Sequence, residues 1–357
     1  MTLRFSKHLD DLHRYVPEWR GLDRSRFLRL DRNESSIPLP EHVAGVLAGY
    51  LTERGVHAYP DAERLSGPLA AYCGVAPECV LTTNGSDQAI DLTLRAFLNE
   101  GDRLLVARPE FAIFGHSATA IGTRVLGIPF REDLSFPYAE FREAAAGERP
   151  DLIVIINPNN PTGTPVTVDF IREMASAYPD VPVIVDEAYY EFTGKTVTGL
   201  MGSHSNLVVL RTFSKAFAMA GLRLGYIVAA PDVIEQIGKL RNPFDVNELA
   251  VVAAEAQLAD LDPMRRYVRQ IVDESKPIVT SFCESRGVPV WPGEANFALI
   301  RLPDCDKAVA FMRDRGILVL SMSAPLLREM VRVSMGTPAE MTRFTQVLEE
   351  YLPGNVG

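Results

Sequence analysis

The sequence has few cysteines, and their spacing excludes the usual roles of cysteine clusters. Cys73, Cys79, Cys283 and Cys305 form no Cys-x-x-Cys pair and do not stand near paired histidines. Zinc ribbons and secreted disulfide frameworks need such spacings, so we expect neither a metal site nor a disulfide scaffold. Free thiols suit a reducing compartment, and we expect the protein to be cytoplasmic.

The chain also lacks an excess of positive charge. Its 36 Lys and Arg residues stand against 46 Asp and Glu residues, which leaves a formal net charge of −10. Binding to nucleic acid depends on clustered cations that release counterions. The charge balance therefore argues against a nucleic-acid partner.

Long hydrophobic runs are absent as well. The longest uncharged stretch, residues 152–168, is interrupted by Pro158, Pro161 and Pro165. A membrane helix needs roughly 20 consecutive apolar residues, so this stretch cannot be one. Charges break the first ten residues at once, and we therefore expect no signal peptide or membrane anchor.

The sequence does contain a regular alternation of strand-like and helix-like segments. Apolar, β-branched runs alternate with helix-period stretches such as residues 88–98. The runs lie at residues 79–83, 103–107, 124–128, 152–156, 181–186, 207–211 and 224–228. This order is typical of an α/β fold with a mostly parallel central sheet covered by helices.

The pattern changes from residue 247 onward. Long helical stretches at 248–258 and 264–286 precede short strands at 296–301 and 330–335 and a terminal helix from Pro338. A length of 357 residues suits two domains at about 150 residues each. We expect an N-terminal arm (1–40) that packs with the small domain, a large domain (41–245) and a small α+β domain (246–357).

Polar residues follow several of the predicted strands. They form the segments Asn84-Gly-Ser-Asp87, Asn157-Pro-Asn-Asn-Pro-Thr-Gly163, Asp186-Glu-Ala-Tyr189 and Thr212-Phe-Ser-Lys215, with Arg223 eight residues beyond the lysine. In open parallel sheets, ligands bind beyond the carboxyl ends of the strands. The first segment also opens a helix, and a helix N-terminus favours an anion.

Together these segments resemble the pyridoxal-phosphate enzymes of the aspartate aminotransferase fold (fold type I), and within them the histidinol-phosphate aminotransferases. The resemblance extends from Tyr59-Pro-Asp61 to the run that ends at Pro338. Its most specific part is Thr212-Phe-Ser-Lys-Ala-Phe-Ala-Met-Ala-Gly-Leu-Arg-Leu-Gly-Tyr226. It implies a large domain that binds pyridoxal 5′-phosphate and an aminotransferase activity.

The resemblance implies that Lys215 bonds covalently to the cofactor and that Asp186 binds its pyridine nitrogen. A carboxylate there keeps the nitrogen protonated, so that the ring can accept electrons. Tyr189 and Asn160 match the residues that bind the cofactor's phenolic oxygen. The alternatives are a surface lysine for Lys215, a helix cap for Asp186 and a core aromatic residue for Tyr189.

The resemblance also implies a cup for the cofactor phosphate. Its candidate residues are Gly85, Ser86, Asp87, Thr212, Ser214 and Arg223. Hydroxyls, a guanidinium and a helix N-terminus suit a dianion, but a carboxylate does not, so Asp87 has the alternative of capping a helix near Gln88. Phe111 matches the aromatic residue that stacks on the ring, with a core phenylalanine as the alternative.

Tyr59 matches a tyrosine that reaches the cofactor phosphate of the neighbouring subunit, which implies a homodimer with shared sites. Arg332 matches the arginine that holds the substrate carboxylate through a bidentate pair. An arginine in a strand is otherwise usually a solvated edge residue. Asn296 is a further candidate for the same wall of the pocket.

Two motifs depart from the histidinol-phosphate aminotransferase pattern. An expected arginine that is associated with the substrate phosphate is replaced in Gly316-Ile-Leu-Val-Leu320, and an expected tyrosine is replaced in Asn33-Glu-Ser-Ser-Ile37. Because Leu320 and Ile37 cannot pair with a phosphate, they favour an unphosphorylated substrate. Replacement cations from the arm stay open, although a solvated surface is the simpler interpretation; they are Arg24, Arg26, Arg29 and Arg32.

The sequence therefore predicts ping-pong transfer of an amino group between an amino acid and a 2-oxo acid. Histidinol phosphate as the true substrate is one alternative. Another is decarboxylation, replacement, cyclisation or oxidation of an amino acid on the same fold. A non-catalytic sensor is the third, and a chain without room for a DNA-binding module before Tyr59 disfavours it.

Overall fold

Strand β5 (Leu152–Ile156) lies inside the large sheet, and all five of its residues are buried. Because successive side chains of a strand point to opposite faces, Ile153 and Ile155 join one hydrophobic core and Val154 and Ile156 join another. A strand that is covered on both faces needs apolar residues throughout. This requirement explains the uninterrupted run of leucine, isoleucine and valine.

The computed structural model describes residues 5–14, 20–53 and 55–352. The large sheet has the order β2-β8-β7-β6-β5-β3-β4, in which β8 runs in the opposite direction to the other strands. The other strands are β2 (Val80–Thr83), β3 (Arg103–Arg108), β4 (Arg124–Pro129), β6 (Val183–Asp186), β7 (Leu207–Thr212) and β8 (Gly225–Ala229). The predicted α/β fold with a mostly parallel sheet is confirmed.

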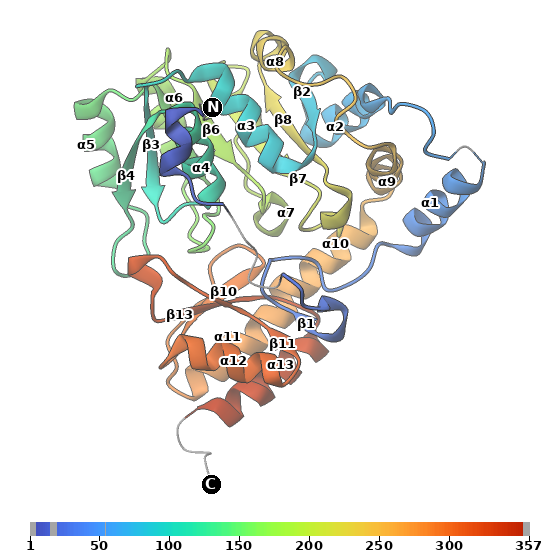
Figure 1. The fold of residues 1–357 in the computed structure, drawn as a ribbon, viewed down its shortest axis with the longest axis vertical. Coiled ribbons are helices and arrows are strands. Elements are labelled where there is room, and N and C mark those ends of the chain that lie inside the picture. The colour runs from blue at the N-terminus through green and yellow to red at the C-terminus, as the bar shows by residue number, and fades with distance from the viewer. Residues whose placement is uncertain (1–4, 15–19, 54, 353–357) are drawn as a thin grey trace, which may run out of the picture.

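Helices cover both faces of this sheet (Figure 1). Ile90, Phe114 and Ile237 bring α3, α4 and α8 into one core, whereas Leu69 and Phe141 bring α2 and α5 into the other, together with α6 and α9. These helices are α2 (Ser66–Cys73), α3 (Gly85–Phe97), α4 (Ala112–Ile121), α5 (Tyr138–Glu148), α6 (Val168–Ala177), α8 (Pro231–Gly238) and α9 (Glu248–Ala259).

The lower part of the molecule in Figure 1 is built on a four-stranded antiparallel sheet of order β12-β13-β10-β9. Its strands are β9 (Val290–Trp291), β10 (Phe297–Arg301), β12 (Leu320–Ser321) and β13 (Met330–Ser334). The helices α10 (Asp262–Arg269), α11 (Lys276–Ser285), α12 (Cys305–Asp314) and α13 (Pro338–Tyr351) accompany it, and a π-helical turn (Gln270–Ser275) joins α10 to α11. A capping box between Thr337 and Glu340 starts α13, which confirms the helix predicted from Pro338.

The N-terminal arm attaches to this lower part. Strand β1 (Leu28–Arg29) pairs in parallel with β11 (Ile317–Leu318), and the carbonyl of Leu30 accepts a hydrogen bond from the backbone N–H of Ser334 over 2.9 Å. Arg32 and Asn33 then contact Lys215 and Tyr189, which lie in the loops after β7 and β6 of the large sheet. The expected arm and C-terminal domain include residues 1–4, 15–19 and 353–357, which lie outside the described residues.

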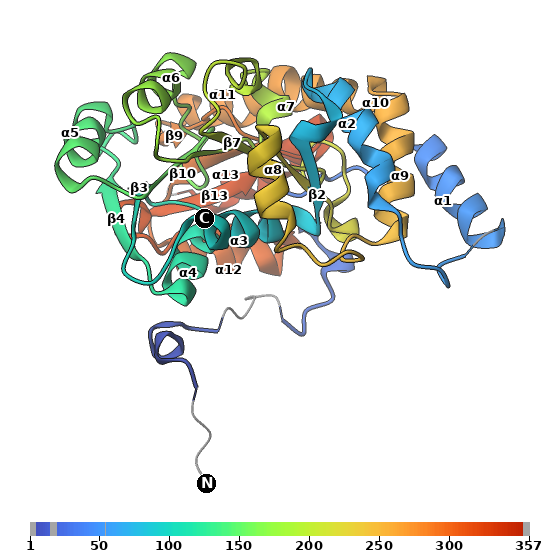
Figure 2. The same ribbon diagram turned by 90° about the horizontal axis from the view of Figure 1, so that it is seen from above.

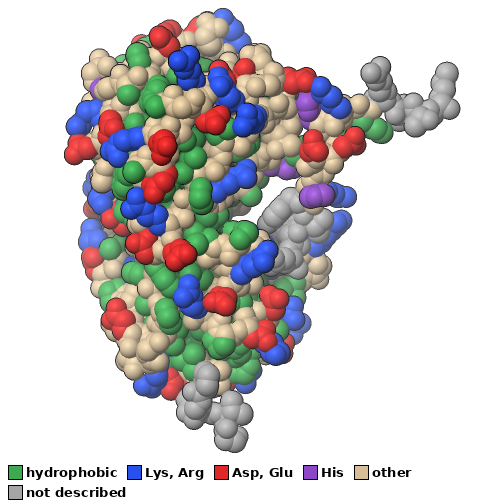
Figure 3. All heavy atoms as spheres, turned by 90° about the vertical axis from the view of Figure 1, so that its left-hand side faces the viewer, with side chains coloured by type: hydrophobic (Ala, Val, Ile, Leu, Met, Phe, Trp, Pro, Cys, Tyr) green, Lys and Arg blue, Asp and Glu red, His purple; other side chains and the backbone are tan. Residues whose placement is uncertain are grey.

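Helix α1 (Glu41–Glu53) stands at one side of the molecule and packs on α9 (Figure 2). On the face shown in Figure 3, the acidic and basic side chains of the described residues intermingle. Among the helices of the described ranges, none combines the length and apolar character that crossing a bilayer requires. The four cysteines are free thiols.

Candidate active site

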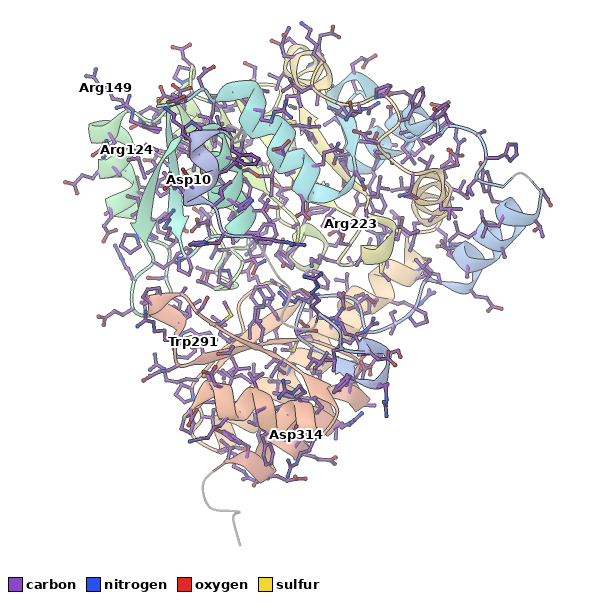
Figure 4. The ribbon with its side chains drawn as sticks, viewed as in Figure 1. Asp10, Arg124, Arg149, Arg223, Trp291 and Asp314 are labelled. Atoms are coloured by element: carbon purple, nitrogen blue, oxygen red, sulfur yellow. The ribbon has the colours of Figure 1, made fainter. Side chains whose placement is uncertain are left out.

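A cavity of about 390 Å³ lies where the parallel strands end. Figure 4 places Arg223, one of its lining residues, near the centre of the view, between the upper and lower parts of the molecule. The other lining residues are Arg32, Glu34, Ser86, Asp87, Phe111, Asn160, Asp186, Ala188, Tyr189, Thr212, Ser214, Lys215 and Ala220. The cavity thus joins most of the residues that the sequence singled out.

Lys215 follows β7 by three residues and points into this cavity. Its Nζ donates to the carbonyl of Arg32 over 3.1 Å, although 183 residues separate the two. Burial, with a further contribution from Arg332, lowers the pKa of Lys215 to about 8. A substantial fraction of this lysine is therefore a neutral amine near pH 8, the form that attacks a carbonyl group.

Asp186 ends β6 and is buried at the wall of the same cavity. Burial raises the pKa of its carboxyl to about 7, while the backbone N–H of Ala188, which donates to Oδ1 over 3.0 Å, opposes that rise. A buried carboxylate without a cation against it is unfavourable, so this position suits a positively charged partner. Two buried titratable groups with opposite pKa shifts mark a functional site.

Tyr189 and Asn160 line the cavity on the side of the lower sheet. The hydroxyl of Tyr189 accepts a hydrogen bond from Nδ2 of Asn33 over 2.9 Å. Burial raises the pKa of Tyr189 to about 12, so the phenol keeps its proton. The amide oxygen of Asn160 accepts from Arg332.

Hydroxyl and guanidinium groups gather at the start of α3. Oγ1 of Thr212 donates to Oγ of Ser214 over 3.0 Å, and Arg223 approaches the same Oγ at 3.5 Å. Gly85 has a left-handed φ of 76°, and a Cβ there would overlap the Arg223 guanidinium. Only glycine lets the helix start and the arginine approach so closely, which leaves the N-terminus of α3 beside a cation.

Asp87 does not cap a helix near Gln88, so that alternative is wrong. Helix α3 begins at Gly85, and Asp87 pairs instead with Arg223 over 3.1 Å. Only that alternative placed the helix start near Gln88, whereas the expectation that the segment Asn84-Gly-Ser-Asp87 opens a helix is confirmed. Both partners are about half exposed, so the pair is open to exchange with a bound anion.

Arg332 is not a solvated edge residue. It lies on β13, between β12 and β10, and is only 7% exposed. Its guanidinium donates to Oδ1 of Asn160 over 2.6 Å and to the carbonyl of Asp31 over 3.0 Å. The described cavity-lining residues do not include Arg332, which meets the cavity through Asn160.

Four other candidates lie away from the cavity wall in the described chain. Leu320 is the direct cross-strand partner of Arg332, and Asn296 is buried and donates to the carbonyl of Asn33. Ile37 lines a different cavity, together with Phe217 and others. Tyr59 is 79% exposed and stacks on Phe244, with 4.4 Å between ring centroids.

Sequence reasoning named Arg32 only as one of four arm arginines that could supply a replacement cation, and it gave no role in the site to Asn33 or Glu34. Arg32 and Glu34 line the cavity, and Asn33 contacts Tyr189. Of the four arm arginines, Arg32 lines the cavity and also lies 3.6 Å from a carboxylate oxygen of Asp31. Arg24 pairs with the carboxylates of Asp31 and Glu34. The signal available in the sequence was the polar run that follows Leu30.

The residues present fit pyridoxal 5′-phosphate. The cavity offers an amine of lowered pKa, a buried carboxylate suited to a protonated ring nitrogen, a phenol and an amide near each other, and hydroxyls beside a helix N-terminus and an arginine. These donors match the aldehyde, pyridine nitrogen, phenolic oxygen and phosphate of that molecule. Fold and site together define a pyridoxal-phosphate enzyme of fold type I.

Comparison with known proteins identifies the family. The model of the family "Aminotransferase class I and II" matches residues 26–348, so the chain belongs to this family and is a pyridoxal-phosphate-dependent aminotransferase. The histidinol-phosphate aminotransferase of Roseiflexus castenholzii is 36% identical over 343 residues, which cover 92% of this chain and 91% of the relative. That of Thermococcus gammatolerans is 32% identical and covers 97% and 98%.

Solved structures give the same fold. Histidinol-phosphate aminotransferase from Sinorhizobium meliloti, in complex with pyridoxal-5′-phosphate, superposes with a TM-score of 0.87 over 99% of both chains at 23% identity, which shows the fold alone. L-threonine-O-3-phosphate decarboxylase from Porphyromonas gingivalis reaches a TM-score of 0.78 at 28% identity, over 91% of this chain and 99% of that one. The relatives from Roseiflexus castenholzii and Thermococcus gammatolerans are named histidinol-phosphate aminotransferases, whereas Leu320 and Ile37 led to the prediction of an unphosphorylated substrate for this chain.

Proposed function

We propose that this aminotransferase acts on a small amine or amino acid that carries an anionic group remote from the reacting nitrogen, with histidinol phosphate as the first substrate to test. The observation that carries the proposal is the position of Arg32, which lines the cavity that holds Lys215. An arginine at a pocket wall is suited to a phosphate or a carboxylate. The names of the similar aminotransferases support a phosphate as the anionic group of the substrate.

The proposed roles follow from the contacts of each residue. When bound, pyridoxal phosphate supplies a carbonyl group and an electron-accepting ring. Lys215 would hold the cofactor covalently through its amine, and the same amine would move a proton to and from the substrate's Cα. Asp186 holds the proton on the pyridine nitrogen, and Tyr189 and Asn160 bind the phenolic oxygen.

The remaining proposed contacts hold the phosphate, the ring and the substrate. Ser86, Thr212, Ser214 and Arg223 bind the cofactor phosphate, and Phe111 stacks on the ring. Arg332, held by Asn160, binds a substrate carboxylate. A guanidinium already oriented by the protein loses little freedom when a carboxylate binds.

A second candidate is transfer from an unphosphorylated amino acid. The observation that favours it is the register between β12 and β13, which sets Leu320 directly opposite Arg332. An apolar side chain beside the substrate arginine offers nothing to a phosphate. The two candidates therefore differ in whether Arg32 replaces the cation that position 320 lacks.

The deciding measurement is kcat/KM for histidinol phosphate and for a panel of unphosphorylated amino acids. In the wild type we expect histidinol phosphate to be preferred, and Arg32→Ser to reduce its kcat/KM by about 10- to 100-fold, because a charge-assisted contact contributes about 1.5–3 kcal/mol. Arg29→Ser, an exposed neighbour on the same arm, is the matched control. A preference for an unphosphorylated amino acid that Arg32→Ser leaves unchanged would establish the second candidate.

The same assay distinguishes the reaction type. Transfer of the amino group consumes a 2-oxo acid in equal amount to the product, whereas decarboxylation releases carbon dioxide and leaves the 2-oxo acid untouched. The name of the Porphyromonas relative makes this control necessary. A reaction that proceeds without any 2-oxo acid would contradict the proposed transfer.

We also propose that the enzyme is a cytoplasmic homodimer in which Tyr59 completes the neighbouring site. Exposed apolar side chains gather on α1, on the loop after it and at Phe244; they are Val46, Leu51, Val56, Tyr59 and Phe244. Such a patch is typical of a surface that another protein covers. Tyr59 is too exposed to serve its own cavity, which supports a role in a second copy.

A further inference from the structure

Asn33 is a buried residue of the arm that forms hydrogen bonds both to the lower sheet and to Tyr189. Its Nδ2 donates to the hydroxyl of Tyr189 over 2.9 Å, and the residue is only 1% exposed. Its φ of 55° lies in the left-handed region, which asparagine adopts more readily than other residues with a side chain. The arm thus adopts an uncommon backbone conformation at the residue that contacts Tyr189.

Ser334 determines which end of the Asn33 amide faces Tyr189. The backbone N–H of Asn33 donates to Oγ of Ser334 over 2.8 Å, and the Ser334 hydroxyl donates back to Oδ1 of Asn33 over 2.9 Å. With its oxygen occupied in this way, the amide presents its nitrogen, which can only donate, to Tyr189. Asn296 donates to the Asn33 carbonyl over 3.2 Å and holds the residue from a second strand.

This arrangement restricts the hydroxyl of Tyr189. A phenol has one hydrogen to donate and an oxygen that accepts. Because Asn33 donates to that oxygen, the hydrogen of Tyr189 must turn to another acceptor. Tyr189 lines the cavity beside Asp186 and Lys215, so the acceptor that fits is a group bound there.

We propose that Asn33 is a positioning residue that makes Tyr189 a hydrogen-bond donor into the cofactor cavity. The proposal rests on the role proposed above for Tyr189 at the cofactor's phenolic oxygen. A hydrogen bond to that oxygen stabilises its anionic form. It therefore lowers the pKa of the neighbouring nitrogen atom, through which Lys215 would hold the cofactor. Asn33 therefore acts on the cofactor's protonation without touching it.

Arg32 and Asn33 each contact one polar group of the cavity, the amine of Lys215 and the hydroxyl of Tyr189. The carbonyl of Arg32 accepts from Lys215, and the side chain of Asn33 donates to Tyr189. Both contacts connect the arm with residues of the large sheet's loops. Correct docking of the arm against β13 is thus coupled to the orientation of two cavity groups.

The test uses the cofactor-loaded enzyme and two variants. Asn33→Gly keeps the left-handed backbone without strain and removes the amide, whereas Asn33→Asp keeps the shape and replaces the donor with an acceptor. The absorbance of the bound cofactor is titrated against pH. In both variants we expect the apparent pKa of the absorbance change to rise by about one pH unit, since the phenolic oxygen loses its donor.

A double-mutant cycle shows whether the effect passes through Tyr189. Tyr189→Phe should produce the same upward shift, and adding Asn33→Gly to it should add little. Ser35→Gly, two residues along the arm and bonded within it to Ile37, is the matched control and should titrate like the wild type. Thermal unfolding of each variant shows whether it is folded.

Three results would overturn the proposal. The first is a wild-type titration in folded Asn33→Gly and Asn33→Asp. The second is an Asn33→Gly shift that persists in full in the Tyr189→Phe background, which would mean that Asn33 acts by another route. If Tyr189→Phe itself leaves the titration unchanged, the proposed role of Tyr189 fails together with that of Asn33, whereas the substrate proposal stands on its own assay.

Discussion

The guanidinium of Arg332 donates a 2.6 Å hydrogen bond to the side-chain oxygen of Asn160, although 172 residues separate them in the chain. Arg332 belongs to strand β13 of the lower sheet, and Asn160 belongs to the loop that follows β5 of the large one. The bond holds the guanidinium beside the cavity and connects the parts of the fold that carry the proposed cofactor and substrate contacts.

Replacing Arg332 should impair binding of a carboxylate-bearing amino donor. We expect Arg332→Lys to raise KM for that donor by about 10- to 100-fold, because lysine keeps the charge but cannot form two parallel hydrogen bonds. Steady-state kinetics with the donor varied provide the measurement. An unchanged KM in the variant would assign the carboxylate to another residue, and Arg301→Lys, a partly exposed arginine on the adjacent strand β10, is the control.

Lys215→Ala should abolish both turnover and covalent attachment of the cofactor. Borohydride reduction followed by mass spectrometry should attach the cofactor to the wild type and not to the variant, because no described cavity-lining residue besides Lys215 carries an amine. Lys195→Ala, which removes an exposed lysine paired with Glu294, should behave like the wild type. Steady turnover by Lys215→Ala would refute the assignment.

Asp186→Asn should still bind the cofactor but lose activity. An amide cannot stabilise a protonated pyridine nitrogen, so kcat should fall by about two orders of magnitude or more. Cofactor content is measured by absorbance after dialysis, beside kcat. Turnover close to that of the wild type would mean that another group supports the ring nitrogen.

The cofactor-free protein should show opposite pH dependences of stability from its two buried charges. The pKa of Asp186 is raised to about 7, so its folded form binds more protons than its unfolded form between about pH 4 and 7, and stability falls as pH rises through that window. The pKa of Lys215 is lowered to about 8, so its unfolded form binds more protons between about pH 8 and 10.5, and stability rises there.

Two variants separate these contributions in denaturant unfolding of the cofactor-free protein. Asp186→Asn should be more stable than the wild type at pH 8 and equal to it near pH 4. Lys215→Met should be more stable below pH 8, and its advantage should vanish above about pH 10.5. Advantages that do not change with pH would show that packing, rather than ionisation, causes them.

Hybrid dimers should recover activity if Tyr59 serves the neighbouring site. Lys215→Ala and Tyr59→Ala chains, each impaired alone, should on mixing form hybrids in which one site has both native residues. We expect the mixture to approach about a quarter of wild-type activity when subunits exchange at random, since one site in four is then intact. Exchange proven by mass spectrometry without any recovery would argue against a shared site.

Much of the fold and of the cofactor cavity could be predicted because the signals are local. The apolar runs at β5 and β7 need cover on both faces, and that need leads to a parallel sheet with helices on either side. Lys215 and Arg223 are separated by only eight residues in the segment that follows β7, so the sequence itself keeps them close to the end of that strand. Asp186, at the end of its own strand, is placed by the same rule.

Only the tertiary structure determined which distant residues contact the residues of the cavity. Nothing in the spacing of the arm predicts that the carbonyl of Arg32 accepts from Lys215 or that Asn33 donates to Tyr189, because both contacts depend on how the arm docks against β13. The strand register, rather than the composition, placed Leu320 opposite Arg332. Local periodicity specifies elements and their ends, whereas contacts between distant residues follow from the packing of those elements, which a single sequence does not display.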